Sequence, residues 1–294
     1  MNLKAHAIIL IGNFFFGCSV IAIKQLAPTF MPALAINVVR ILTALVLFWI
    51  LFLFKKDKTK VIEKSDWPRL IACAFTGIII NQILFVKGTS ITSPIHASLL
   101  GLSTPIVIMI LGFFLNKESI KPNLIVGLLL GIIGATILIF LKTKSDKEST
   151  ILGDVLVILN ATSYATYLII AKPLIKKYSP ITIIRWAFTI GAVIIVPFGW
   201  KDFTSVNFNA VLQIHQNIWA LIFICVGATF ISYLCIMHGI AKMGSQVVGS
   251  YIYTQPIFAT IAAMMLFKEP LNATKIIAAL LIFGGVYLVN ATKK

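Results

Sequence analysis

The sequence predicts an all-α membrane protein of ten transmembrane helices, arranged as two inverted repeats of five. Three observations predict it: an apolar composition, ten apolar runs of membrane-spanning length, and a short polar motif that occurs twice. Of the 294 residues, 59% are hydrophobic and 12% are charged, and the mean hydropathy is +1.00. Soluble domains are about half apolar and a quarter charged, so this chain has too little charge to cover a water-exposed surface.

Each of the ten apolar runs is long enough to cross a bilayer, because about 20 helical residues span ~30 Å of hydrocarbon. These runs are too long and too continuously apolar for the strands of a membrane barrel, which leaves helices. The first run lacks a convincing cleavage site, so we read it as a mature helix and not as a signal peptide. The expected helices cover 5–23, 33–54, 69–87, 95–115, 123–141, 153–171, 180–198, 218–240, 246–267 and 275–291.

The net charge of +16 resides in short loops between the apolar runs, which favours membrane-flanking positive charge over a nucleic-acid-binding face. Lysine and arginine are more numerous on the side of the N-terminus, with much of the excess in residues 55–69. Cytoplasmic loops carry such an excess, so both termini should face the cytoplasm. We therefore expect a multi-pass protein of the inner or plasma membrane with the lipid bilayer as a partner.

The four cysteines lie inside apolar runs and form neither a CxxC pair nor a cluster with histidine. We interpret them as small buried hydrophobes and expect no disulfide and no metal site. The sequence also lacks P-loop, HExxH and GxSxG motifs, which argues against an enzyme and against ATP-driven transport by this chain alone. No cofactor is expected.

A polar motif that follows a long apolar run occurs twice, as LNKESIKPN at 115–123 and as LFKEPLNAT at 266–274. Residues 84–140 can be laid on residues 235–291 without gaps, and the matches include residues that punctuate helices. Because each repeat holds five spans, the second repeat must enter the membrane from the opposite side. The matched pairs include Gly88 with Gly239, Pro105 with Pro256, Glu118 with Glu269 and Gly134 with Gly285.

Inverted repeats related by a pseudo-two-fold axis in the membrane plane are a recurring plan of secondary transporters. Two similar halves of opposite orientation can exchange conformations, so that a site between them opens to one side and then to the other. Duplication can also build an inert bundle, but this topology favours transport. We expect a first repeat at 1–142, a linker at 143–150 and a second repeat at 151–294.

Two stretches of the chain resemble the two copies of the EamA family signature. They are FVKGTSITSPIHASLLGLSTPIVIMILGFFLNKESI at 85–120 and SYLCIMHGIAKMGSQVVGSYIYTQPIFATIAAMMLFKEPL at 232–271. This family belongs to the drug/metabolite transporter superfamily. The resemblance extends over essentially the whole chain, because it includes the region of Arg40 and the stretch ILGDVLVILNATSYATYLIIAK at 151–172. The resemblance implies a central cavity lined by the first four spans of each repeat. The chain departs from the family pattern at NFFFGCS in the first span and at His238.

Arg40 lies about 12 Å into the second span, at 1.5 Å per helical residue. An arginine at the bilayer centre costs about 2.5–3.5 kcal/mol and therefore needs partners. No acidic residue falls at an expected midplane, so the partners are backbone carbonyls, Asn37 or an anionic solute. A structural role and a clamp for a substrate carboxylate both remain open. Arg185 is shallower and can extend its charge toward water, so we rank it below Arg40.

The acidic residues all lie in loops or near span ends, which argues against a carboxylate relay for proton coupling. His96 and His238 lie within spans and are the alternative proton carriers, although a membrane histidine is more often a packed, hydrogen-bonded residue. Coupling to protons or to a counter-substrate therefore stays open.

Uncharged polar side chains concentrate in the spans that the resemblance places around the cavity, whereas the fifth span of each repeat is almost purely apolar. Some of these side chains should join helices to one another, and others should line the cavity. The candidate substrate-binding residues are Asn13, Arg40, Asn81, Gln82, His96, Asn160, Tyr164, Tyr167, Tyr233, His238, Tyr251 and Gln255.

Pro105 and Pro256 occupy matched mid-span positions, and each removes one backbone hydrogen bond from its helix. They are either hinges for gating or prolines that a membrane helix tolerates. Gly127, Gly131 and Gly134 form a small-residue face that fits packing within the chain or in a homodimer.

The sequence thus predicts a secondary transporter that exports or exchanges small metabolites, such as amino-acid-like or related amphipathic solutes, by alternating access through a central cavity. The alternative is a lipid-handling protein, an intramembrane enzyme or a scaffold protein. No convincing catalytic dyad supports the enzyme alternative.

Overall fold

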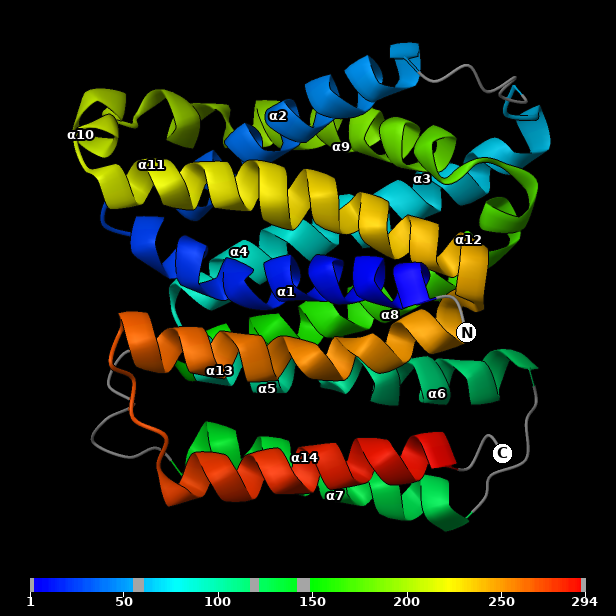
Figure 1. Ribbon diagram of the computed structural model, residues 1–294, viewed down its shortest axis with the longest axis vertical. Helices are drawn as coiled ribbons and strands as arrows, with labels where there is room; N and C mark the ends of the chain where they lie inside the picture. The colour runs from blue at the N-terminus through cyan, green and yellow to red at the C-terminus, as the bar shows by residue number, and fades with distance from the viewer. Residues whose placement is uncertain (1–2, 55–60, 117–121, 142–148, 292–294) are drawn as a thin grey trace.

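The computed structural model describes residues 3–54, 61–116, 122–141 and 149–291 (Figure 1). These residues form helices joined by short connections, and no strand occurs among them. Six helical segments are long and apolar enough to cross a membrane, and four shorter apolar helices accompany them. The expected all-α membrane fold is therefore confirmed.

The first repeat supplies five expected spans, two of which are built from more than one helical piece. Its helices are α1 (Leu3–Leu26), α2 (Ala33–Phe54), α3 (Trp67–Ala74), α4 (Asn81–Ser90), α5 (Pro94–Leu100), α6 (Ser103–Asn116) and α7 (Pro122–Phe140). A π-helical segment, Phe75–Ile80, joins α3 to α4 in a single span.

The second repeat follows the same plan. Its helices are α8 (Ile151–Lys177), α9 (Pro180–Thr204), α10 (Phe208–Leu212), α11 (His215–Ile222), α12 (Ser232–Tyr251), α13 (Gln255–Leu266) and α14 (Ala273–Ala291). A π-helical segment, Phe223–Ile231, joins α11 to α12, and a 3-10 turn, Ile252–Thr254, precedes α13. The short helix α10 lies in the connection between α9 and α11.

The two halves run in opposite directions through the bundle. In Figure 1, α1 begins and α14 ends at the right, where α6 also ends and α7 begins. In contrast, α13 ends and α14 begins at the left. The motif LNKESIKPN, whose residues 117–121 lie outside the described chain, and the motif LFKEPLNAT thus mark opposite ends of the molecule. This is the arrangement that inversion requires.

Equivalent helices of the two repeats meet each other, as a two-fold relation requires. Helix α2 packs on α9, and α7 packs on α14, each the counterpart of the other. The contact of α4 with α8 is likewise repeated by the contact of α12 with α1. A pseudo-two-fold axis therefore runs through the middle of the bundle.

Helices α7 and α14 pack against each other through the small-residue face of Gly127, Gly131 and Gly134. From the sequence, this face could have served packing within the chain or in a homodimer. A Cβ atom added at Gly285 would lie 2.4 Å from the carbonyl oxygen of Gly127. A Cβ atom added at Gly134 would likewise lie 2.9 Å from the Ala278 carbonyl oxygen, so the two helices approach this closely because Gly134 and Gly285 have no side chain. The glycine face is therefore used inside the chain. The outer sides of the pair expose large apolar side chains such as Leu129 and Leu280, as a lipid-facing surface does.

Candidate solute-binding cavity

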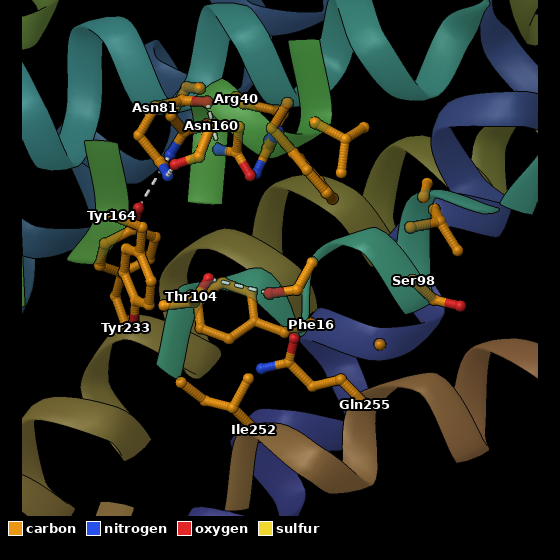
Figure 2. Close-up of a pocket in the computed structure, with 17 residues that line it drawn as sticks. Phe16, Arg40, Asn81, Ser98, Thr104, Asn160, Tyr164, Tyr233, Ile252 and Gln255 are labelled. Atoms are coloured by element: carbon orange, nitrogen blue, oxygen red, sulfur yellow. Dashed lines mark hydrogen bonds between the residues drawn. The ribbon is translucent and has the colours of Figure 1, made fainter. Parts of the chain in front are cut away.

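A cavity of about 90 Å³ lies between the two repeats near the middle of the bundle (Figure 2). The first repeat lines it with α1, α2, α4 and the α5–α6 segment, and the second lines it with α8, α12 and the start of α13. The fifth span of each repeat, α7 and α14, contributes no residue to the described lining. This division agrees with the expectation drawn from the polar residues.

Seven of the twelve candidate substrate-binding residues line this cavity. They are Arg40, Asn81, Gln82, Asn160, Tyr164, Tyr233 and Gln255. Sequence reasoning missed the hydroxyl side chains of Ser98 and Thr104 and the aromatic side chains of Phe16 and Phe85. Ser98 and Thr104 flank the break in the fourth span, so their closeness to Pro105 was the signal that could have identified them.

Asn81 and Asn160 join the two repeats by a reciprocal pair of hydrogen bonds on one wall of the cavity. The Asn160 Nδ2 donates to the Asn81 carbonyl at 2.8 Å, and the Asn81 Nδ2 donates to the Asn160 carbonyl at 3.5 Å. The equivalent contact between α12 and α1 has a similar link, because the Ser232 hydroxyl donates to the Gly12 carbonyl at 3.0 Å, although neither residue is among the described lining. In both links, a side chain of one repeat bonds to the backbone of the other repeat.

A second link crosses between the repeats at the level of the cavity. The Gln82 Nε2 donates to the Tyr233 hydroxyl at 3.4 Å, and this hydroxyl donates to the Gly77 carbonyl at 3.1 Å. Gln82 and Tyr233 each follow a π-helical segment, Phe75–Ile80 in one repeat and Phe223–Ile231 in the other. Such segments shift the register of a helix and occur often at functional sites.

Arg40 lines the cavity with a side chain that is 2% exposed. Its Nε donates to the Thr229 hydroxyl at 3.0 Å, and that hydroxyl donates to the Ile224 carbonyl at 2.7 Å. The Nη1 atom of Arg40 is buried without a hydrogen-bond partner. The ion pairs found within the described residues do not include Arg40. The cavity thus has a positive group without an acidic partner.

Arg185, the loose counterpart of Arg40 in the second repeat, has a different environment. Its guanidinium carbon lies 3.3 Å from the centre of the Phe52 ring and 4.9 Å from that of the Trp49 ring. The centre of the Trp186 ring is 5.7 Å away. Aromatic faces stabilise a cation by their quadrupole. Arg185 is therefore accommodated at the α2–α9 contact and does not line the cavity.

The two predicted hinge prolines follow matched breaks in their helices. Helix α5 ends at Leu100 and α6 begins at Ser103, two residues before Pro105. Helix α12 ends at Tyr251, and Pro256 lies in the first turn of α13. The Gly101 carbonyl, which Pro105 leaves without its helical donor, accepts from the backbone N–H and hydroxyl of Thr104. Both breaks face the cavity, since residues at each of them line it.

The other candidate residues lie away from the described lining. Asn13 stands behind it and accepts a hydrogen bond from the Gln255 Nε2 at 2.7 Å. The Tyr167 hydroxyl contacts the sulfur of Met237 in the apolar core, and Tyr251 pairs with His6 near the start of α1. His238 is exposed on the outer surface of α12. Spacing alone did not distinguish these positions, because each lies on a helix that also contributes to the cavity.

His96 belongs to a buried polar network at the end of the bundle opposite the start of α1. Its Nδ1 lies 3.0 Å from the Ser149 hydroxyl and 3.4 Å from a carboxylate oxygen of Asp154. Thr92 donates a hydrogen bond to the other Asp154 oxygen and accepts one from Lys24 at its carbonyl. Asp154 does lie near a helix end, as the sequence indicated, but it is fully buried. The cavity reaches Ala97 and Ser98, directly after His96.

An ionic cluster closes the other end, on the side where α1 begins. The Lys177 Nζ lies 2.5 Å from a carboxylate oxygen of Glu63 and 2.7 Å from one of Asp66. The Tyr178 hydroxyl also donates to Asp66, at 2.6 Å. This cluster joins the start of α3 to the α8–α9 connection, and therefore one repeat to the other. A buried apolar cluster from α1, α2, α3, α8, α9 and α12 lies between it and the cavity.

A bundle with inverted repeats, two broken helices and a polar central cavity has the architecture of a multi-pass membrane transporter. Residues 3–140 and 151–291 each match the EamA-like transporter family. The chain therefore belongs to this family, whose members are transporters and not enzymes, and the resemblance seen in the sequence is confirmed.

The chain also resembles individual proteins that carry general names. The chain is 25% identical over 282 residues to the uncharacterized transporter YetK of Bacillus subtilis, covering 95% of this chain and 84% of that protein. It is 24% identical to an uncharacterized transporter of Archaeoglobus fulgidus, covering 94% of both chains. It is also 25% identical to the chloroplastic WAT1-related protein At3g02690 of Arabidopsis thaliana, covering 96% of this chain and 68% of that protein. A solved crystal structure with 14% identity superimposes with a TM-score of 0.68, covering 99% of this chain and 98% of the other.

Proposed function

We propose that this protein is a secondary transporter that moves small polar solutes, amino-acid-like ones among them, by alternating access through the central cavity. The observation that carries this proposal is the cavity itself, which is formed jointly by two inverted repeats and flanked by a helix break in each. Broken helices expose backbone groups to a bound solute and provide places to bend. We propose export or exchange as its direction, with both termini in the cytoplasm and Pro105 and Pro256 as hinges.

The contacts at the two ends support a mechanism in which one end opens while the other closes. Lys177 joins the end of α8 to Glu63 and Asp66 at the start of the third span. At the opposite end, the Gln25 Nε2 of α1 donates to the side-chain Oδ1 of Asn217 in α11 at 2.9 Å. Since α1 corresponds to α8 and α11 to α3, the repeats place a polar link at equivalent positions on both ends. Breaking one link and keeping the other opens one side only.

The test is solute flux into proteoliposomes that contain the purified chain. Flux of a metabolite panel should saturate with concentration, and it should fall strongly in Gln82→Ala and in Asn160→Ala, which alter the cavity wall. His238→Ala is the matched control, because His238 is a polar residue in a span but is exposed outside the cavity. Its flux should equal that of the unmodified protein.

Two results would contradict the proposal. One is the absence of saturable flux for every solute of the panel, together with accelerated lipid movement between leaflets, which would favour the lipid-handling class. The other is equal flux in the cavity variants and the control, which would show that the transported solute does not pass through this cavity. Protease accessibility of a tag at each terminus tests the proposed cytoplasmic location.

A further inference from the structure

The Arg40 side chain is a buried cation whose charge has no partner in the described chain. It is 2% exposed, and among the described residues its one hydrogen bond is to Thr229 and its buried Nη1 has no acceptor. Leaving a buried donor unpaired is costly, and a buried charge without a counter-ion costs more. Arg185 also has a buried donor without an acceptor, its Nε, so the surroundings of the two guanidinium groups must distinguish their roles.

Arg185 shows how this chain accommodates an arginine that serves packing. Its guanidinium lies against Phe52 and Trp49, which supply the electrostatic stabilisation that a carboxylate would otherwise provide. Arg40 is absent from the close cation–ring contacts of the described residues, and it is Arg40 that lines the cavity. Arg40 therefore differs from Arg185 in having neither an aromatic nor an acidic partner among the described residues, and in lining the cavity where a solute would lie.

We propose, on the basis of the transport function proposed above, that Arg40 binds the carboxylate of a small organic monoanion. The guanidinium retains N–H donors besides the one given to Thr229, and planar guanidinium donors match the two oxygens of a carboxylate. Asn81 and Gln82 lie on the same cavity wall, and the Gln82 Oε1 has no donor in the described chain. That oxygen can accept a hydrogen bond from a hydroxyl group of the solute.

The lining also limits what else the solute can carry. No acidic side chain is among the described lining residues, so a solute needs no ammonium group to match the site. One arginine balances one negative charge, which favours a monocarboxylate over a phosphate dianion. A cavity of about 90 Å³ holds roughly six to nine water-sized positions. Phe16 and Phe85 offer an apolar surface to the body of such a solute. The class is thus a short hydroxy, keto or alkyl monocarboxylate.

The experiment compares lactate with its uncharged amide, lactamide, by thermal unfolding of the full purified chain in detergent. Alanine and inorganic phosphate complete the set of probes. Lactate should stabilise the unmodified protein in a saturable manner, since a ligand of the folded state raises the unfolding temperature with its occupancy. Lactamide, which has the same size but no charge, should not. Arg40→Gln should weaken lactate affinity by about thirtyfold or more, because it removes one partner of a buried charge pair.

Two further variants keep the test decisive if Arg40→Gln does not fold. Arg40→Lys retains the cation without the planar donors and should keep the preference for lactate over lactamide at reduced affinity. Arg185→Gln removes an arginine outside the cavity and should leave lactate affinity unchanged. Equal stabilisation by lactate and lactamide, stabilisation by phosphate alone, or full lactate affinity in Arg40→Gln would each overturn the assignment. Saturable flux of neutral solutes with no carboxylate binding would overturn it while leaving the transport function intact.

Discussion

Gln82 donates a hydrogen bond to Tyr233 at 3.4 Å, and these two residues are separated by 151 positions, the offset of the internal repeat. They therefore occupy equivalent places in the two halves of the chain. Equivalent residues can touch only beside the axis that relates the halves. Because both residues also line the cavity, the pseudo-two-fold axis passes through the place where a solute would bind. A solute there contacts both repeats and can be exposed by a movement of either.

Tyr233→Phe tests whether this link contributes to transport. The variant removes the hydroxyl that donates to the Gly77 carbonyl and accepts from Gln82. We expect a several-fold loss of flux with a stability change of about 1 kcal/mol, the scale of one hydrogen bond between membrane helices. Tyr167→Phe is the control, because its hydroxyl contacts only the weak acceptor Met237 Sδ within the described chain. Proteoliposome flux and thermal unfolding measure the two effects, and equal flux in both variants would contradict the expectation.

Exchange should be faster than net transport if Arg40 binds an anion. Closing the empty cavity leaves the buried cation of Arg40 unpaired, whereas closing the loaded cavity buries a neutral pair. The effective penalty for an unpaired buried ion is several kcal/mol, so exchange should exceed net flux by roughly tenfold or more. Uptake of labelled lactate into vesicles preloaded with unlabelled lactate, against empty vesicles, measures the ratio. Equal rates in the two preparations would show that the empty carrier reorients freely.

Pro105→Ala and Pro256→Ala test the proposed hinges. Alanine restores an N–H that can bond to the carbonyl four residues earlier and thus continue the helix across the break. We expect a lower maximal rate of flux with solute affinity kept within about threefold, because the prolines lie beside the cavity and offer no donor to the solute. Pro173→Ala is the control, since Pro173 is exposed within the uninterrupted helix α8. An unchanged maximal rate in both hinge variants would favour prolines that are merely tolerated.

The neighbouring glycines Gly284 and Gly285 offer a matched test of the α7–α14 contact. A Cβ at Gly285 would lie 2.4 Å from the Gly127 carbonyl oxygen, while a Cβ at Gly284 meets no atom within 4 Å. Gly285→Ala should therefore destabilise the protein by about 1–3 kcal/mol through overpacking. Gly284→Ala should be neutral or stabilising, since alanine favours a helix over glycine. Thermal unfolding distinguishes them, and similar stabilities would mean that this contact is looser than described.

Much of the architecture followed from the sequence because the bilayer restricts the choices. Apolar runs of the required length must be helical, and the matched positions of Pro105 and Pro256 indicated two related halves. The same reasoning found seven cavity residues and also proposed Asn13, His96, Tyr167, His238 and Tyr251, which are not among the described lining. Successive residues of an α-helix point in directions about 100° apart, and a π-helical segment changes the direction in which all later side chains of the helix point. A one-dimensional pattern in an almost uniformly apolar chain gives no way to choose the face.

The sequence by itself determined the class of fold, the two repeats and their opposite orientations, because span length and residue punctuation are local properties. Only the tertiary structure separated Arg40 from Arg185, which the sequence ranked by depth alone. It placed Arg185 against the rings of Trp49 and Phe52 and left Arg40 beside the cavity with no aromatic or acidic partner among the described residues. The role of a charge depends on what surrounds it, and in this chain those surroundings come from the opposite repeat: Arg40 bonds to Thr229, which is 189 positions away.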